Sequence, residues 1–165
     1  MPAVVSDTSV INYLAAAGLT DLLRVQFGTI YIPPAVWREL HVGANLPGTH
    51  AADQAYQAGW LLIQEPTSAK LLATLLEELD PGEAEAIVLA SEFNPATVLL
   101  DEMDGRMAAR RLGLPVIGTA GILVAARRSG HLNGIKPILD DLMKNHRFRL
   151  SHELYCQLII GDPVA

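Results

Sequence analysis

The sequence lacks the features of several common classes of protein. Cys156 is the only cysteine among 165 residues, so no intrachain disulfide can form, and neither a cysteine-based zinc cluster nor an oxidising compartment is indicated. The five histidines show no zinc-ligand spacing. No apolar run approaches the length of a membrane span, and no signal peptide opens the chain. These absences predict a cytoplasmic protein that does not enter a membrane.

Several catalytic motifs are also missing. The sequence has no glycine-rich phosphate loop and no G-x-S-x-G, so P-loop nucleotide hydrolysis and serine hydrolase chemistry lack support. Phosphatase chemistry of the haloacid-dehalogenase type would require a second Asp two residues after Asp7, where the chain has Ser9. We therefore set these three reactions aside.

Basic side chains are scarce in the first hundred residues. The net charge of −6 argues against broad electrostatic binding to nucleic acid, but the balance is −8 over the first hundred residues and +2 over the remainder. Arg106, Arg110 and Arg111 fall on one predicted helix, and Arg127 and Arg128 end the next. These arginines either hold phosphates or lie on solvated helix faces, and the sequence leaves both interpretations open.

Short apolar runs are present at intervals that suit a parallel sheet. Half of the chain is hydrophobic, enough for a sizeable core, and we expect a single domain over residues 1–165. Strand-like runs alternate with helical stretches, which is the rhythm of an α/β protein. The predicted strands are residues 3–5, 29–32, 98–100 and 115–117, with 60–64 as either a further strand or a helix-ending turn. The predicted terminal helices are 135–145 and 151–160, and residues 43–50 are predicted to form a loop near the site.

Asp7 follows the first predicted strand directly. In an open α/β sheet, ligands bind outside the carboxyl ends of the strands, so this position lies at the usual edge of a site. The alternative is that Asp7 only caps the helix that follows. The hydroxyls of Thr8, Ser9 and, after a later strand, Thr119 have the same two interpretations: they position water or phosphate, or they cap helices.

Three further acids occupy matching places. Glu39 lies in the first or second turn of a helix that follows a strand, although it could equally face solvent. Glu83 and Glu85 lie in the first turn of a strong helix, where the helix dipole alone favours acids. Residues two apart on a helix do not share a face, so only one of the two should point at a given site, and we favour Glu83. Asp101 follows a buried strand-like run directly, with Asp104 and Glu102 as the next candidates.

The chain resembles the PIN-domain family over nearly its whole length. The resemblance rests on SDTSV, IPPAVWREL, DPGEAEAIVLA, LLDEMDGRMAARRLGLPVIGTAGILVAARRSGHL and IKPILDDLM. It is closest to a prokaryotic subgroup of predicted nucleic-acid-binding PIN proteins, relatives of the VapC-type ribonuclease toxins. The resemblance implies a three-layer α/β/α fold with a central parallel sheet of four or five strands. It also implies a metal-dependent endoribonuclease that cleaves single-stranded RNA.

The resemblance carries the family's acidic site onto Asp7, Glu39, Glu83 and Asp101, as catalytic residues and as ligands of Mg²⁺ or Mn²⁺. Oxygen-rich sites suit such hard cations. Many toxin members have Asp in place of Glu83, so Glu85 stays an alternative ligand. The subgroup often has two successive Asp residues where this chain has Asp101 and a Glu, so the ligand set stays open, and Asp104 is a second reserve.

The resemblance also implies partners. Single-stranded RNA is the expected substrate, with Thr8, Ser9, Arg106 and Thr119 as candidate substrate-binding residues. An antitoxin protein and a second copy of the chain in a homodimer are the expected protein partners. The competing hypothesis is a catalytically silent nucleic-acid-binding or protein-interaction module of the same fold, in which the acids are structural. Clustered acids without a metal should repel one another and raise some of their pKa values.

Overall fold

The computed structural model describes residues 2–43 and 45–163, and within them the chain forms a five-stranded parallel sheet. The strand order is β3-β2-β1-β4-β5, and every neighbouring pair is parallel. The strands are β1 (Ala3–Ser6), β2 (Ile30–Ile32), β3 (Leu61–Ile63), β4 (Ala96–Leu99) and β5 (Val116–Ile117). The predicted parallel sheet is confirmed, and residues 60–64 supply its fifth strand.

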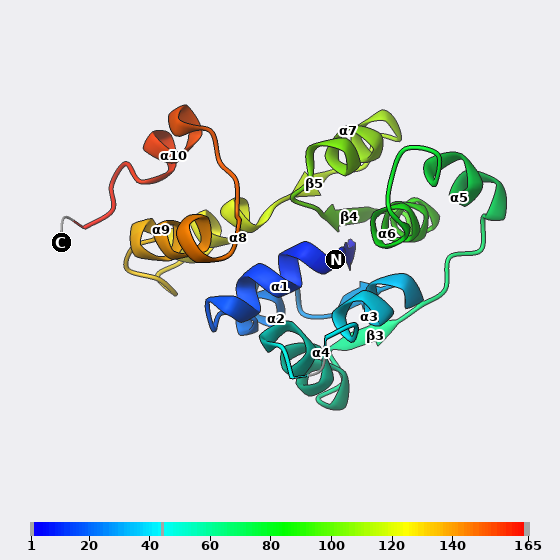
Figure 1. Ribbon diagram of the computed structural model, residues 1–165, viewed down its shortest axis with the longest axis horizontal. Helices are drawn as coiled ribbons and strands as arrows, with labels where there is room; N and C mark the ends of the chain where they lie inside the picture. The colour runs from blue at the N-terminus through cyan, green and yellow to red at the C-terminus, as the bar shows by residue number, and fades with distance from the viewer. Residues whose placement is uncertain (1, 44, 164–165) are drawn as a thin grey trace.

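Helices connect the strands and cover both faces of the sheet (Figure 1). In chain order they are α1 (Thr8–Ala16), α2 (Asp21–Phe27), α3 (Pro34–Leu40), α4 (Pro47–Gln57), α5 (Ala69–Leu75), α6 (Pro81–Glu92), α7 (Met103–Arg111), α8 (Thr119–Arg128), α9 (Lys136–Asn145) and α10 (His152–Leu158). Within the described residues, none of these helices combines the length and apolarity needed to cross a membrane.

Two apolar cores lie on opposite faces of the sheet because successive strand residues alternate sides. Val4 and Leu99 belong to the first core, with buried residues of α1, α2, α8 and α9. Val5 and Val98 belong to the second core, with buried residues of α5, α6 and α7. Strands buried on both faces read as continuous apolar runs, which is why they were detectable in the sequence. The predicted three-layer α/β/α arrangement is confirmed.

The predicted loop over residues 43–50 is partly wrong. Helix α4 begins at Pro47, whose fixed φ suits the first position of a helix. Thr49 is buried and its hydroxyl donates to the carbonyl of Leu40 at 2.6 Å, so this turn packs into the structure. The turn-rich composition continues into Pro47 and Gly48, which nevertheless lie in the helix, so only the described residues before Pro47 are non-helical. Residue 44 lies outside the described part of the chain.

The two terminal helices differ in how they pack. Leu139 and Leu142 of α9 are fully buried in the first core. Helix α10 has no buried residue among those described, and only one side of it packs against the core, through Tyr155 and Leu158. Both predicted terminal helices are present, but α9 packs fully into the core and α10 does so only in part.

We expect Leu139→Ala to lower the free energy of unfolding by about 2–5 kcal/mol, because it leaves a cavity in the core. Leu154→Ala in α10 is the matched control. Since Leu154 is 40% exposed, its loss should cost well under half as much. Urea unfolding followed by circular dichroism measures both values, and equal losses would contradict the different packing of the two helices.

Candidate active site

The carboxyl ends of β1 and β4 lie side by side at one edge of the sheet. Ser6 pairs with Leu99, and the backbone N–H of Asp7 donates to the carbonyl of Leu99 at 3.0 Å. Asp101 follows two residues later along the neighbouring strand. Asp7 and Asp101 therefore emerge at the same edge, as the strand pattern predicted.

A cavity of about 510 Å³ opens at this edge and is lined by six carboxylate side chains. We call it the acidic pocket. Its acids are Asp7, Glu39, Asp80, Glu83, Glu102 and Asp104. Thr8, Ser9, Asn12 and Met103 complete the lining, so among the described residues no Lys or Arg faces these acids across the pocket. The pocket concentrates oxygen donors and negative charge.

Asp7 is buried in the wall of the acidic pocket, with only 4% of its surface exposed. It occupies the position before α1, but its side chain makes no capping hydrogen bond to that helix. Its carboxylate accepts a hydrogen bond from the hydroxyl of Ser9 at 3.2 Å. Burial, reinforced by repulsion from Asp80 and Glu39, raises the pKa of Asp7 to about 7, although Ser9 and the nearby N–H of Thr8 act in the opposite direction.

Glu83 is held at the start of α6, where its backbone N–H donates to the capping carboxylate of Asp80 at 3.0 Å. Its own carboxylate is buried, and Oε1 has no hydrogen-bond partner among the described residues. Burial, followed by repulsion from Asp80 and Asp7, raises the pKa of Glu83 to about 8. A buried oxygen without a partner is costly, and a proton or a cation would satisfy it.

Glu39 and Glu85 connect α3 and α6 in two different ways. Glu39 reaches the acidic pocket, where it accepts hydrogen bonds from the hydroxyl of Thr8 at 2.5 Å and from the backbone N–H of Gly82 at 2.9 Å. Glu85 turns away from the pocket and accepts from the backbone N–H of Ala35 at 2.9 Å. Of the two acids at the start of α6, Glu83 lines the pocket and Glu85 does not.

Asp101 does not line the acidic pocket but lies in the neighbouring cleft. Both of its carboxylate oxygens are occupied by Thr119, whose backbone N–H donates at 2.8 Å and whose hydroxyl donates at 2.7 Å. Burial raises the pKa of Asp101, while these hydrogen bonds and the charge of Arg106 oppose the rise. The hydroxyl of Thr119 is therefore used to orient Asp101.

Three glycines leave room for three of the predicted site carboxylates. The pairs are Gly82 with Glu39, Gly105 with Glu83, and Gly118 with Asp101. A Cβ at Gly105 would lie 2.9 Å from Oε1 of Glu83, and a Cβ at Gly118 would lie 2.9 Å from Oδ1 of Asp101. Glycine is unfavourable inside a helix, so Gly105 within α7 was a signal in the sequence for such a close approach.

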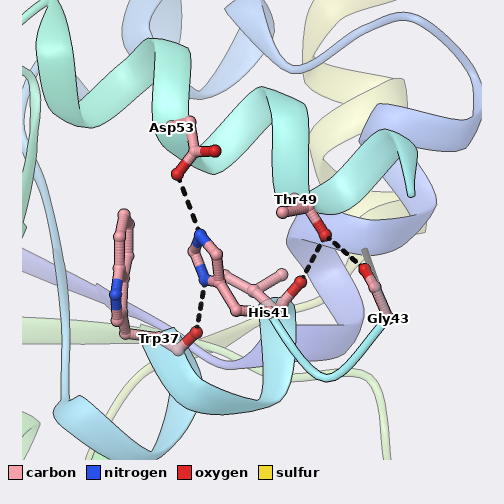
Figure 2. Close-up of polar contacts among 6 residues, drawn as sticks. Trp37, His41, Gly43, Thr49 and Asp53 are labelled. Atoms are coloured by element: carbon pink, nitrogen blue, oxygen red, sulfur yellow. Dashed lines mark hydrogen bonds and ion pairs between the residues drawn. The ribbon is translucent and has the colours of Figure 1, made fainter. Parts of the chain in front are cut away.

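His41 braces the end of α3 that carries Glu39 (Figure 2). The two ring nitrogens of His41 lie 2.7 Å from the carbonyl of Trp37 and 2.8 Å from the carboxylate of Asp53 in α4. Both partners are acceptors, so the protonated ring can donate to both of them. Burial lowers the pKa of His41, but the hydrogen bonds with Asp53 and Trp37 outweigh it and raise the pKa above 6.5.

The other predicted residues fall into two groups. Asp104, a reserve ligand, lines the acidic pocket together with Thr8 and Ser9. Arg106 lies in the neighbouring cleft, where it donates to the carbonyl of Leu100 at 2.8 Å. Two other arginines are engaged elsewhere: Arg111 pairs with Glu78, and Arg127 pairs with Asp162 at the far end of α8.

The sequence analysis singled out neither Asn12 nor Asp80 as a site residue. Both line the acidic pocket. The sequence did contain a signal for Asp80. The Asp-Pro-Gly turn begins α6, so Asp80 lies at the same end of that helix as Glu83. Within residues 2–43 and 45–163, no three His, Cys, Asp or Glu side chains already form a group that could hold one metal ion. The four-ligand metal centre therefore stays a prediction.

The fold and site define a parallel α/β protein with an acidic pocket at the carboxyl edge of its sheet. The model of the PIN-domain family DUF3368 matches residues 3–160, and the chain belongs to this family. The PIN domain is a nuclease fold, and nucleases of this fold typically use divalent metal ions.

Comparison with solved structures finds a PilT N-terminus domain protein from the hyperthermophilic archaeon Sulfolobus solfataricus P2. It is 16% identical, with a TM-score of 0.41, and the match covers 76% of this chain and 93% of that one. No curated protein matches the sequence.

We expect Asp7→Asn to stabilise the metal-free protein above neutral pH. An acid whose pKa rises on folding stabilises the native state fully below its ordinary value of 3.8, and this contribution is lost as pH rises through about 7. The variant cannot ionise, so near pH 8.5 in EDTA it should exceed the parent by about 2 kcal/mol, and near pH 5 the difference should shrink.

Urea unfolding at the two pH values measures this difference. The matched control is Glu153→Gln, because Glu153 is exposed on α10, outside the acidic pocket. Its stability should follow that of the parent at both pH values. If Asp7→Asn also followed the parent, the side chain of Asp7 would not be a buried charge.

Proposed function

We propose that the protein is a divalent-metal-dependent endoribonuclease that cleaves phosphodiester bonds of single-stranded RNA. The observation that carries the proposal is the buried Oε1 of Glu83, which has no hydrogen-bond partner among the described residues and lies in a pocket lined with five further acids. None of the described lining residues is a Lys or Arg that could pair with this oxygen. A hard divalent cation would supply the missing charge.

The residues present fit such an ion by their chemistry. Carboxylate oxygens are the protein ligands that Mg²⁺ and Mn²⁺ prefer, and Mg²⁺ is usually held through one or two carboxylates with several waters. Asp7 and Glu83 would hold the ion, with Glu39 and Asp104 within the same pocket. When bound, a divalent ion activates water and stabilises charge on the phosphate in an in-line displacement.

The protein's own residues orient and support this site. Thr8 and the backbone of Gly82 fix the two oxygens of Glu39, and Ser9 orients Asp7. Asp101 would act from the neighbouring cleft, held by Thr119, beside the reacting phosphate. We further propose a cytoplasmic protein that functions as a homodimer, with an antitoxin as its protein partner.

We expect Glu83→Gln and Asp7→Asn each to lower Mn²⁺-dependent cleavage of a mixed-sequence pool of single-stranded RNA by at least about 100-fold, because each removes a charged ligand. Gel electrophoresis of end-labelled RNA measures the rate. Circular dichroism checks that both variants are folded. Thermal unfolding with added Mn²⁺ gives a second measurement, since only the parent should gain stability from the ion.

Glu85→Gln is the matched control for Glu83→Gln. It makes the same change two residues further along α6, and the Gln carbonyl can still accept from the N–H of Ala35. Its cleavage rate should stay within about twofold of the parent's. A parent that cleaves no RNA with Mn²⁺ or Mg²⁺ would overturn the proposal in favour of the silent binding module. Equal losses in the two Gln variants would remove Glu83 from the site.

A further inference from the structure

A second cleft, of about 760 Å³, adjoins the acidic pocket. The two share Glu102 and Met103 in their linings, so they are continuous at the rim. This cleft contains a concentration of positive charge, and we call it the basic cleft. Its cationic side chains are Arg106, Arg110, Arg147 and Arg149.

These four side chains are a third of the chain's 12 Lys and Arg residues, gathered in one cleft of a protein whose net charge is −6. Among the described residues, none of the four forms an ion pair with a carboxylate. Arg110, Arg147 and Arg149 are exposed. Burial, followed by the charge of Arg110, lowers the pKa of Arg106, while Asp101 acts in the opposite direction. Asp101 and Glu102 also line the cleft, but the four arginines outnumber these two acids, so the cleft keeps a net positive charge that attracts an anion.

Two elements far apart in the sequence form the basic cleft. Arg106 and Arg110 are one turn apart on α7, so they lie on the same face of that helix. The other two arginines flank Phe148, which is buried in the first core and packs edge-to-face on Tyr13 with the ring centroids 4.9 Å apart.

Anchoring by Phe148 places its exposed neighbours at the cleft. Arg147 has a φ of +59°, a conformation that costs free energy in any residue other than glycine. Despite this backbone strain at Arg147, both arginines line the cleft. The segment between α9 and α10, anchored in the core by Phe148, therefore sets the positions of the two arginines.

We infer that the basic cleft binds the phosphates of single-stranded RNA next to the bond that is cleaved. This inference rests on the proposed nuclease function, because it assigns the path of that function's substrate. The acidic pocket repels phosphate when it holds no metal, so the strand needs a separate cationic surface nearby. Arginine is well suited to that role, because its guanidinium binds phosphate oxygens in pairs.

The lining of the basic cleft also suits nucleotides better than an acidic peptide. Tyr13 and Met103 stand among the arginines, and Met103 is 63% exposed although its side chain is apolar. Aromatic and apolar surfaces beside a cationic groove are the usual platform for the bases of a single strand. An acidic segment of a partner protein would use only the charges.

We expect the double variant Arg110→Gln/Arg149→Gln to weaken RNA binding by at least about tenfold near 0.1 M salt. The measurement is fluorescence anisotropy of a short labelled single-stranded RNA in EDTA, where no cleavage occurs. Each lost phosphate contact should reduce the slope of log affinity against log salt by about 0.7, so the double variant should lose about 1.4. Thermal unfolding checks that the variant folds.

The matched control is Arg24→Gln/Arg128→Gln, which removes the same charge from exposed positions on α2 and α8 outside the basic cleft. It should bind RNA as the parent does. Equal weakening in the control would mean that only net charge matters, and would overturn the inference. A parent that binds an acidic peptide but no RNA would overturn it too.

Cleavage assays distinguish this inference from the proposed function. With Mn²⁺, the variant of the basic cleft should raise KM by about the factor by which it weakens binding and leave kcat nearly unchanged. A parent that cleaves RNA, with a variant of unchanged KM and affinity, would refute the basic cleft alone. A parent that binds RNA through this cleft but never cleaves it would refute the nuclease proposal alone.

Discussion

The candidate site depends on the burial of two carboxylates, Asp7 and Glu83, in a pocket whose described lining contains no Lys or Arg. Burial destabilises the charged form of each acid, so both acids stay protonated at higher pH than usual, and their pKa values are raised. Clustering of acids was expected to raise these values. Repulsion contributes, but burial is the larger cause at both positions, because the side chains lie within the wall of the pocket.

Much of this arrangement could be predicted from the sequence, because it follows from local rules. Asp7 and Asp101 each follow an apolar run, and parallel strands bring their carboxyl ends to one edge. The direction of each side chain could not be predicted in the same way. Asp101 turns towards Thr119, a contact set by the pairing of β4 with β5, and Glu85 is occupied by α3. Both depend on tertiary contacts that have no local signature.

The uneven charge along the chain becomes an uneven charge across the molecule. The acids of the pocket come mainly from β1, α3, α6 and the start of α7, whereas the arginines of the basic cleft come from α7 and the segment before α10. The two surfaces meet at Met103 and Glu102, where α7 begins. The protein therefore has a cationic surface beside the acidic one, although its net charge is −6. Average charge excludes broad binding to nucleic acid but not binding along one path.

Protons and a divalent ion would compete for the same oxygens. Near neutral pH the metal-free pocket keeps protons on Glu83 and partly on Asp7, which limits the repulsion that would otherwise oppose folding. Binding of a cation requires that these protons leave, so metal affinity should increase with pH. When protonated, these acids let the pocket fold without a metal. When they lose their protons, the same acids bind a divalent cation favourably.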